Sequence, residues 1–359
     1  MPKKSFSGFS QNLYSTSLKN IAYIEIDTHA EIAADFMDLM NDSKEFSVDY
    51  YFSEKIKNRI GQNHENIRQS DNSVILDQLK AKEYDLIIVG TVHRYFSTFL
   101  AVTQKYKTAV IVHNLNFSKA SKFDLLRNIF KEDVIYRLKL WCKEGLTVSS
   151  KVYENAAYLL VLDEEFSSSK YQFLPLFYTK EFIQNKNGKL TVVIPGGVSQ
   201  KRRDYRHILN VIQTSELAEN IQFIFLGKAK GEELASIKKV SENYDLKCFS
   251  ERISQDEFEA YMKNADMLWC PIQQETTFFS QNEIYGVTKM TGNMGDAIKF
   301  GKIAVFPKNY ASEPGFTVRE KDNVVQQFYG LKDFKYDFQK HYNKRTVLEN
   351  LENMIDNLI

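Results

Sequence analysis

The chain is poor in cysteine and has no long apolar run. Its 359 residues include only three cysteines, Cys142, Cys248 and Cys270, which lie far apart and without metal-ligand spacing. A disulfide-built scaffold is therefore excluded, and so few thiols are typical of a reducing compartment. No apolar run approaches the ~18 residues that a membrane-spanning helix needs. The basic N-terminal stretch MPKKSFS leads into no apolar segment, so we expect a cytoplasmic protein.

A strong charge of either sign is also missing. Lys and Arg total 47 against 46 Asp and Glu, a net charge of +1. That balance argues against a dedicated nucleic-acid binder, which usually carries a marked basic excess. The signatures Gly-x-Ser-x-Gly, His-Glu-x-x-His, Cys-x-x-Cys and Asp-x-Asp do not occur either. With 43% hydrophobic residues the chain can build ordinary cores, and its length favours two domains of about 100–200 residues each.

Short apolar runs alternate with helical segments along the first half. Runs without polar–apolar alternation are typical of strands buried on both faces, as in parallel sheets. Their alternation with helices predicts a doubly wound α/β domain. The predicted strands are 20–27, 46–52, 84–90, 108–113 and 158–163, with helices over 31–40 and 95–106.

The same alternation restarts after a less regular segment, 167–188, which we interpret as a linker. The predicted strands are then 190–195, 222–226, 267–270 and 303–306, and the helices 203–214, 232–243, 255–264 and 294–300. A last helix is indicated by the spacing of Leu348, Leu351, Met354 and Leu358.

These patterns predict two Rossmann-like doubly wound domains that face a cleft. The expected boundaries are 1–180 for an N-terminal domain and 181–340 for a C-terminal domain. A closing helix within 341–359 could cross back to the N-terminal domain. In open α/β sheets ligands bind beyond the carboxyl ends of the strands, so candidate site residues are sought directly after predicted strands.

The first candidate site is a glycine-rich basic turn, PGGVSQKRRDY, between a predicted strand and helix. Gly196 and Gly197 let the backbone turn tightly and approach a ligand closely. Three cations, Lys201, Arg202 and Arg203, follow near the predicted helix start, where the helix dipole disfavours each by about 0.3–1 kcal/mol. A bound diphosphate would reverse that cost through the cations and backbone N–H groups. The alternative is a solvated basic turn.

The second candidate site is the segment QNEIYGVTKMTGNMGDAIKFGK. Thr291 is a good N-cap for the predicted helix, and Gly292 and Gly295 leave room for a ligand backbone or phosphate near its start. Lys289 stands just before this helix, again at the end that disfavours a cation. Asp296 lies in the early helix, where a carboxylate is favoured for structural reasons alone. Glu283 precedes the loop and could accept hydrogen bonds from sugar hydroxyls.

These segments resemble the donor site of GT-B-fold glycosyltransferases, especially the retaining glycosyltransferase family 4. Glu283-Ile-Tyr-Gly286 is similar to the family's Glu-Gly-Phe-Gly, and Asp296-Ala-Ile-Lys-Phe-Gly301 to the helix that its second glutamate opens. In this chain the two acids stand five residues further apart, and the second is Asp. The basic turn is similar to the family's first loop, whose Arg/Lys pair holds the donor diphosphate. The resemblance covers nearly the whole second half, and in the first half it rests on strand order.

The resemblance implies that a sugar is transferred with retention, and without a metal or cofactor, from a nucleotide-diphosphate donor to a glycan or lipid-linked acceptor. Such a reaction would make a polysaccharide or glycoconjugate. Lys201 and Lys289 would act on the diphosphate, and Glu283 on the sugar. The segment 249–261 is similar to one that contacts the base. The implied donor-binding residues are Gly196, Gly197, Arg202, Arg252, Ile253, Tyr285, Gly286, Thr291, Gly292 and Asp296. The alternatives are a GT-B-type sugar-nucleotide epimerase and a non-catalytic sugar-nucleotide-binding subunit.

Three histidines, His29, His93 and His113, directly follow predicted strands of the first half. A functional role would place them on the acceptor side of the cleft, and His113-Asn114 resembles a loop common in GT-B transferases. If the reaction inverts, it requires a base, and His29 or His113 is then the best candidate. The alternative for each is a structural histidine.

A basic segment over 119–143 carries seven Lys and Arg against three acids, with Phe123, Leu126, Phe130 and Trp141 interspersed. Such a segment could dock on an anionic membrane that carries a lipid-linked acceptor, so peripheral contact with the inner face of the cell membrane is expected. A solvated helix face over a core is the alternative. No nucleic-acid partner is expected.

Overall fold

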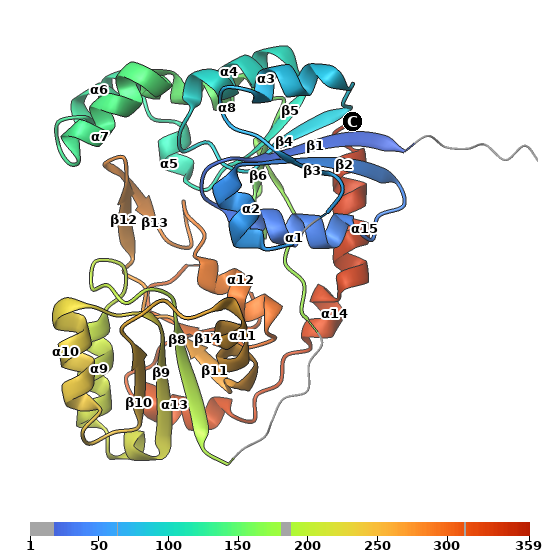
Figure 1. Ribbon diagram of the computed structural model, residues 1–359. Helices are drawn as coiled ribbons and strands as arrows, with labels where there is room; N and C mark the ends of the chain where they lie inside the picture. Colours follow the sequence, from blue (N-terminus) through green and yellow to red (C-terminus); the bar gives the residue numbers. More distant parts are fainter. Residues whose placement is uncertain (1–17, 63, 181–187, 312–313) are drawn as a thin grey trace, which may run out of the picture.

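The N-terminal half folds around one parallel sheet. A computed structural model describes residues 18–62, 64–180, 188–311 and 314–359. Seven strands lie in the order β3-β2-β1-β4-β5-β6-β7, and neighbouring strands are parallel (Figure 1). Because the order reverses between β1 and β4, this sheet has the switch point at which open α/β sheets bind ligands. The strands are β1 (Lys19–Glu25), β2 (Phe46–Phe52), β3 (Ile67–Gln69), β4 (Leu86–Val89), β5 (Thr108–Ile111), β6 (Tyr158–Val161) and β7 (Tyr171–Phe173).

The second half repeats this plan with six parallel strands. Their order is β10-β9-β8-β11-β14-β15, with the reversal between β8 and β11. The predicted α/β architecture of two Rossmann-like sheets is therefore confirmed. The strands are β8 (Leu190–Pro195), β9 (Ile221–Lys228), β10 (Leu246–Phe249), β11 (Met267–Trp269), β14 (Ile303–Phe306) and β15 (Thr317–Arg319).

Helices cover both faces of the first sheet (Figure 1). Along β1, Ile21 and Tyr23 enter a core shared with α1, whereas Ala22 and Ile24 enter a second core shared with α4. This period of two is why the strand reads as a continuous apolar run. The helices of this half are α1 (Ala30–Met40), α2 (Glu54–Ile60), α3 (Ile75–Gln78), α4 (Phe96–Lys105), α5 (Leu115–Ser118), α6 (Lys122–Asn128), α7 (Val134–Lys139) and α8 (Ser149–Asn155).

One helix of the second half begins later than predicted. The helix expected over 203–214 starts at Tyr205, because the Asp204 carboxylate accepts the His207 backbone N–H at 3.1 Å and so forms the N-cap. The three cations before it therefore lie in a turn and not in the helix. The helices of this half are α9 (Tyr205–Thr214), α10 (Gly231–Val240), α11 (Gln255–Asn264), α12 (Gly292–Lys299), α13 (Val324–Leu331), α14 (Phe338–Tyr342) and α15 (Lys344–Asp356).

The last helix, α15, packs against the first domain (Figure 1). Its buried stripe is Val347, Leu351 and Ile355, which join the core that contains α1. Of the predicted stripe, Leu351 and Leu358 are buried as expected, whereas Leu348 and Met354 are only partly buried. Polar contacts add to the packing, among them a hydrogen bond of 2.6 Å from Ser43 Oγ to the Glu352 carboxylate and ion pairs from Lys344 to Asp38 and Asp42. The chain thus returns from the second sheet to the first.

A two-stranded antiparallel hairpin, β12 (Glu275–Phe278) and β13 (Gln281–Ile284), was not predicted. In Figure 1 it rises from the second domain towards α5, α6 and α7 of the first. Its two turn residues, Phe279 and Ser280, have φ angles of 48° and 55°. Two-residue hairpin turns with positive φ usually contain glycine or asparagine, so the sequence carried no turn signal here.

Candidate functional site

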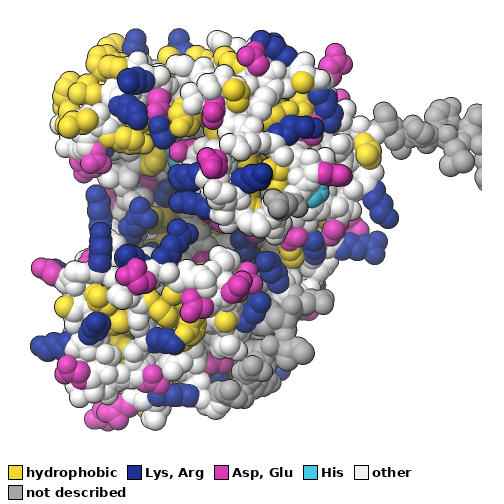
Figure 2. Space-filling view, viewed as in Figure 1, with side chains coloured by type: hydrophobic (Ala, Val, Ile, Leu, Met, Phe, Trp, Pro, Cys, Tyr) yellow, Lys and Arg dark blue, Asp and Glu magenta, His cyan; other side chains and the backbone are white. Residues whose placement is uncertain are grey.

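The molecule is hollowed between its two halves, and Lys and Arg side chains gather along the hollow (Figure 2). The helix α12 starts at this cleft, with Thr291 as its N-cap. A side chain added at Gly292 would meet no atom within 4 Å, so the helix start is open. Free backbone N–H groups and the helix dipole make such a start suited to an anion.

The glycine-rich turn after β8 lies beside the start of α12. Gly196 has φ of +105°, and a Cβ at this position would lie 2.4 Å from Nη2 of Arg203. A Cβ on Gly227 would lie 2.3 Å from the carbonyl oxygen of Gly196. Glycine is therefore favoured at 196 by the backbone conformation, and it is required at 227, where a Cβ would meet the backbone of the turn. At Gly197 a side chain would meet nothing within 4 Å, so the turn is open on that side.

Arg203 joins the turn to the helix. Its Nη2 donates to the Asn293 side-chain oxygen at 3.2 Å, and its Nη1 donates to the Gly197 carbonyl at 3.3 Å. The Asn293 amide in turn donates to the Pro195 carbonyl at 3.3 Å. The Arg203 Nε is buried and has no hydrogen-bond partner among the described residues. This guanidinium therefore lies between the glycine-rich turn and the open start of α12.

The sequence had assigned the diphosphate to Lys201, Arg202 and Lys289. Lys201 and Arg202 are exposed in the turn. Arg202 lies near enough to Lys289 for its charge to lower the Lys289 pKa. Arg203 belongs to the same motif but was not assigned to the diphosphate. The helix was predicted to begin at 203, and that start did not indicate that the Arg203 side chain contacts α12. Asn293, the second residue of α12, was missed altogether, because nothing local to it signals a partner 90 residues away.

Two titratable groups flank the cradle formed by the Gly196–Gly197 turn, Arg203 and the start of α12. Burial is the main cause that lowers the pKa of Lys289 to about 8; the charge of Glu283 opposes the shift and the charge of Arg202 adds to it. Burial also raises the pKa of Asp296 to about 6, against the opposing effects of Lys299, Asn293 and Arg203. The site therefore holds a lysine and a carboxyl that both titrate near neutral pH, which is common at functional sites. A bound anion would favour the charged lysine and the neutral carboxyl.

Glu283 lies in a position that the sequence did not predict. Its buried carboxylate, on β13, accepts the backbone N–H groups of Phe117 at 2.9 Å and Asn116 at 3.3 Å. Burial raises its pKa, and a hydrogen bond from Thr288 opposes that shift. The carboxylate thus caps α5 of the other domain and is enclosed by it. Its sugar contact stays a prediction, and its observed contacts are those of an interdomain anchor.

The three histidines after β1, β4 and β5 meet at the opposite wall of the cleft. The rings of His29 and His113 are stacked with centroids 4.0 Å apart, and the His93 ring lies 5.7 Å from each. Burial, together with the charge of His29, lowers the pKa of both His93 and His113 well below the usual value. The His113 Nε2 lies 2.8 Å from the Gly90 carbonyl. His93 and His113 are therefore neutral, and one ring nitrogen of each has a hydrogen-bond partner, Asn114 for His93 and Gly90 for His113.

His29 differs from the other two. Its side chain is 29% exposed, and its Nδ1 lies 2.8 Å from the Glu31 carboxylate. Burial raises the pKa of Glu31, but the hydrogen bond and charge of His29 outweigh burial and lower it overall. With Nδ1–H donating to Glu31, the Nε2 atom would carry the lone pair that a base needs. Among the sequence candidates, His29 has the better geometry for that role.

Asn114 connects the two walls. Its amide lies 3.1 Å from His93 Nε2, and its side-chain oxygen accepts a hydrogen bond from Lys289. The next residue, Leu115, donates its backbone N–H to the Thr288 carbonyl at 3.0 Å. The predicted His113-Asn114 loop is thus in direct contact with the predicted Lys289 loop.

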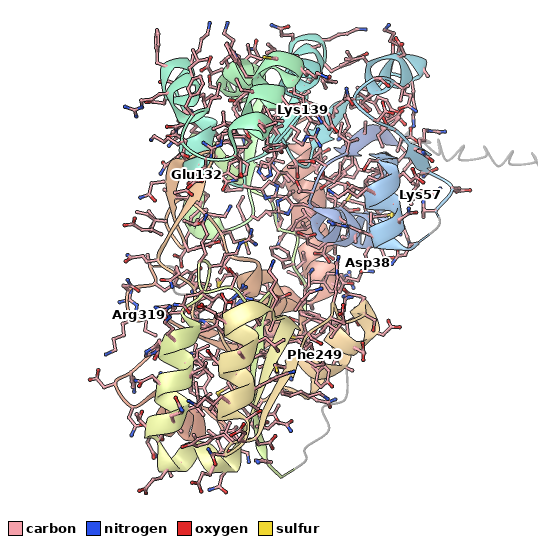
Figure 3. The ribbon with its side chains drawn as sticks, turned by 60° about the vertical axis from the view of Figure 1, so that its left-hand side comes forward. Asp38, Lys57, Glu132, Lys139, Phe249 and Arg319 are labelled. Atoms are coloured by element: carbon pink, nitrogen blue, oxygen red, sulfur yellow. The ribbon has the colours of Figure 1, made fainter. Side chains whose placement is uncertain are left out.

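The remaining predicted residues lie around this centre. Tyr285 is half-buried, and Gly286, with φ of +80°, closes a tight turn by donating its N–H to the Lys289 carbonyl at 3.0 Å. Arg252 is exposed and Ile253 half-buried, just after β10. Figure 3 places Phe249, the last residue of β10, on the side of the second domain that faces the first. The segment follows β10, which lies two strands away from β8 in the sheet.

The fold and cleft define the GT-B architecture: two Rossmann-like domains, each with its switch point, that face each other. No protein-family model matches the sequence, and a comparison with curated protein sequences finds no match. Within the described part of the chain, no group of three or more His, Cys, Asp or Glu side chains could hold a metal ion.

Solved structures with similar folds span nearly the whole chain. The lipopolysaccharide outer core galactosyltransferase WaaB is 10% identical, with a TM-score of 0.55 over 95% of this chain and 100% of that one. The UDP-GlcNAc 2-epimerase from Neisseria meningitidis bound to UDP-GlcNAc is 10% identical, with a TM-score of 0.52 over 94% and 100%. A glycotransferase of kitacinnamycin is 11% identical, with a TM-score of 0.50 over 94% and 99%. At such identities the similarity establishes the fold and leaves the reaction open.

Proposed function

We propose that this chain is a glycosyltransferase that takes a sugar from a nucleotide-diphosphate donor. The observation that carries the proposal is the Arg203 guanidinium, which lies across the Gly196–Gly197 turn at the start of α12. Its buried Nε has no hydrogen-bond partner in the part of the chain that the structure describes. A diphosphate there would meet a guanidinium, open backbone N–H groups and the nearby Lys289. The galactosyltransferase WaaB and the epimerase bound to UDP-GlcNAc have a similar fold, which supports this assignment.

Each predicted donor residue has a role in the proposal. Arg203, with Lys201, Arg202 and Lys289, would neutralise the diphosphate as it departs, and Thr291 and Gly292 keep the helix start open to it. Asp296 would face the donor from the second turn of α12. Tyr285 and Gly286 shape the Lys289 turn, and Arg252 and Ile253 would border the base. We assign Glu283 a positioning role, because its carboxylate holds α5 and the loop that carries His113 and Asn114.

We propose a retaining, metal-independent reaction like that of family 4. The bond from the anomeric carbon to the diphosphate oxygen breaks while the acceptor oxygen forms a new bond on the same face. The acceptor's proton passes to the departing phosphate, so no protein base is needed. The cations described above would stabilise the developing phosphate charge. The acceptor would be a glycan or a lipid-linked molecule held on the histidine side of the cleft.

Epimerisation of the donor is a second candidate. The Neisseria epimerase matches the chain about as well as the transferases do, and the clustered histidines could exchange protons with a sugar. The two reactions differ in one requirement, because a transferase needs an acceptor. Conversion of UDP-GlcNAc in the absence of any acceptor would identify the epimerase.

The direct test is a melting experiment with UDP, GDP, TDP, CMP and their sugars. A ligand at about 100 times its Kd adds about 2.7 kcal/mol to the free energy of unfolding, so the matching nucleotide should raise the Tm clearly. Turnover of the matching nucleotide-sugar is then followed with and without glycan or lipid-linked acceptors. If none of the nucleotides or nucleotide-sugars changes the Tm, the assignment is wrong.

A further inference from the structure

Large apolar side chains are exposed together on one face of the first domain. In the described part of the chain, six of the eleven exposed large hydrophobic residues lie within 123–141. Phe123 is 82% exposed, Phe130 69% and Ile135 88%, and the other three are Val134, Tyr136 and Trp141. Figure 2 shows hydrophobic side chains gathered at the upper left, where Figure 1 places α6 and α7. Clustered apolar exposure of this kind marks an interaction surface.

The local fold turns these side chains outward. On α6, Leu125 is buried in the core of the first sheet, and Ile129 directly after the helix joins it. These anchors fix the helix so that Phe123 and Phe130 face solvent. A bend at Asp133, with φ of 46°, then redirects the chain into α7 and exposes Ile135. The exposed residues therefore do not belong to the face of α6 that packs against the core, because Leu125 and Ile129 already fill that position.

Positive charge surrounds the apolar residues. Six cations of the segment 119–143 are exposed, and its acids are Asp124, Glu132 and Asp133. Figure 3 shows Lys139 and Glu132 on the helical layer above the first sheet. The exposed cations are Lys119, Lys122, Arg127, Lys131, Lys139 and Lys143. Aromatic and aliphatic side chains among lysines are the pattern that partitions into the interface of an anionic bilayer.

The reverse side of the same segment contacts the tip of the β12–β13 hairpin. Arg137 of α7 is buried and donates to Ser280 Oγ at 2.8 Å. The Asn128 amide donates to the carbonyls of Phe279 and Ser280 at 3.2 and 3.3 Å. These contacts hold the hairpin tip, and the same hairpin carries Glu283 towards the site. A surface bound to this face would lie at the edge of the cleft.

We propose that the α6–α7 face, formed by the six apolar residues and six cations named above, docks on a bilayer that contains anionic lipids. No helix in the described ranges is long and apolar enough to cross a membrane. The apolar side chains enter the headgroup region and the lysines contact lipid phosphates. Docking in this orientation brings the cleft edge to the bilayer, where a lipid-linked acceptor would be within reach.

Flotation of the full chain with vesicles tests the docking. The vesicles contain phosphatidylcholine alone or phosphatidylcholine mixed with phosphatidylglycerol, and no nucleotide is present. We expect binding to the mixed vesicles only, weakened by salt because exposed charges are screened. A Phe130→Ser/Ile135→Ser variant should bind about tenfold more weakly or worse. The matched control is Leu217→Ser/Phe334→Ser, which changes exposed apolar residues of the second domain.

The charge contribution is tested with Lys131→Glu/Lys139→Glu against Lys238→Glu/Lys239→Glu on α10. The first pair should lower binding by about tenfold or more at low salt, and the second should not. Since all these side chains are exposed, the Tm should stay unchanged. Equal binding to both vesicle types, or equal binding by the apolar variant, would overturn the proposal. So would a dimer in sedimentation that the apolar variant converts to a monomer, because the face would then join two copies. Nucleotide binding and sugar transfer are measured separately, so either result leaves the other intact.

Discussion

The two sheet edges that face the cleft have the same topology and opposite chemistry. The edge of the second sheet carries Arg203, Arg202 and Lys289 around an open helix start. The edge of the first sheet carries three histidines, and burial holds His93 and His113 neutral. The shared strand order explains why both edges can form sites, since each reversal opens a crevice. Which edge receives an anion is decided by the side chains alone.

The largest expected effect is on the cationic edge. Arg203→Ala should weaken nucleotide binding by about 10- to 100-fold, because a hydrogen bond to a charged group contributes about 1.5–3 kcal/mol. Arg203→Lys should lie between the variant and the unaltered chain, since lysine keeps the charge but loses the planar fork. Isothermal titration with the nucleotide found in the melting screen measures this. Arg206→Ala, in the exposed first turn of α9, is the matched control and should bind normally. Normal nucleotide binding by Arg203→Ala would show that the nucleotide does not bind at this turn.

Glu283 sharpens the comparison by joining the two edges. Glu283→Ala should lower the free energy of unfolding by about 1–3 kcal/mol, because the N–H groups of Asn116 and Phe117 lose their buried acceptor. The loss should appear without any ligand in a denaturant titration. Glu275→Ala, on the paired strand and exposed, is the control and should be nearly neutral. A variant with unchanged stability but a raised KM for the nucleotide-sugar would instead support the sugar contact.

The pH dependence of donor binding should reveal the two groups that flank the cradle. Nucleotide-sugars are suitable probes, since their diphosphate has no titrating terminal oxygen. Affinity should be highest at low pH, fall as Asp296 ionises near its pKa of about 6, and fall again as Lys289 loses its proton near its pKa of about 8. Each step should change the affinity by about tenfold or less, because water in a partly solvated site weakens the interaction between the diphosphate and each charged group.

Asp296→Asn should abolish the lower step and leave the upper one. Asp256→Asn, exposed on α11, should leave both. An affinity that rises between pH 5 and 7 would mean that the anion does not lie beside Asp296.

The smallest effect is expected on the histidine edge. If the reaction retains configuration, His29→Asn should lower kcat by less than about tenfold, because the general-base contribution of about 10²- to 10⁴-fold is not used. NMR of the product reports the anomeric configuration independently. A loss of several hundredfold together with an inverted product would make His29 and Glu31 the catalytic base pair and contradict retention.

By itself the sequence determined the two-sheet plan. Strands such as β4 and β8 are buried on both faces, so their apolar runs are local signals that survive without knowledge of the fold. Thr291 and the open glycine at the start of α12 were likewise visible, because capping depends on adjacent residues. The histidines could be assigned to one edge, since all three follow parallel strands. The family resemblance implied a donor site in the second half, which the residues alone do not state, and that role stays a prediction.

Only the tertiary structure decided which side chains enter the site. Arg203, and not its exposed neighbours, reaches α12 because its partner Asn293 comes from a helix 90 residues further along the chain. Glu283 turns to α5, and the Phe279–Ser280 turn keeps its positive φ without glycine because Arg137 and Asn128 hold it from the other domain. These outcomes depend on contacts between distant segments. No local pattern of propensity or spacing encodes such contacts, and packing between the domains decides them.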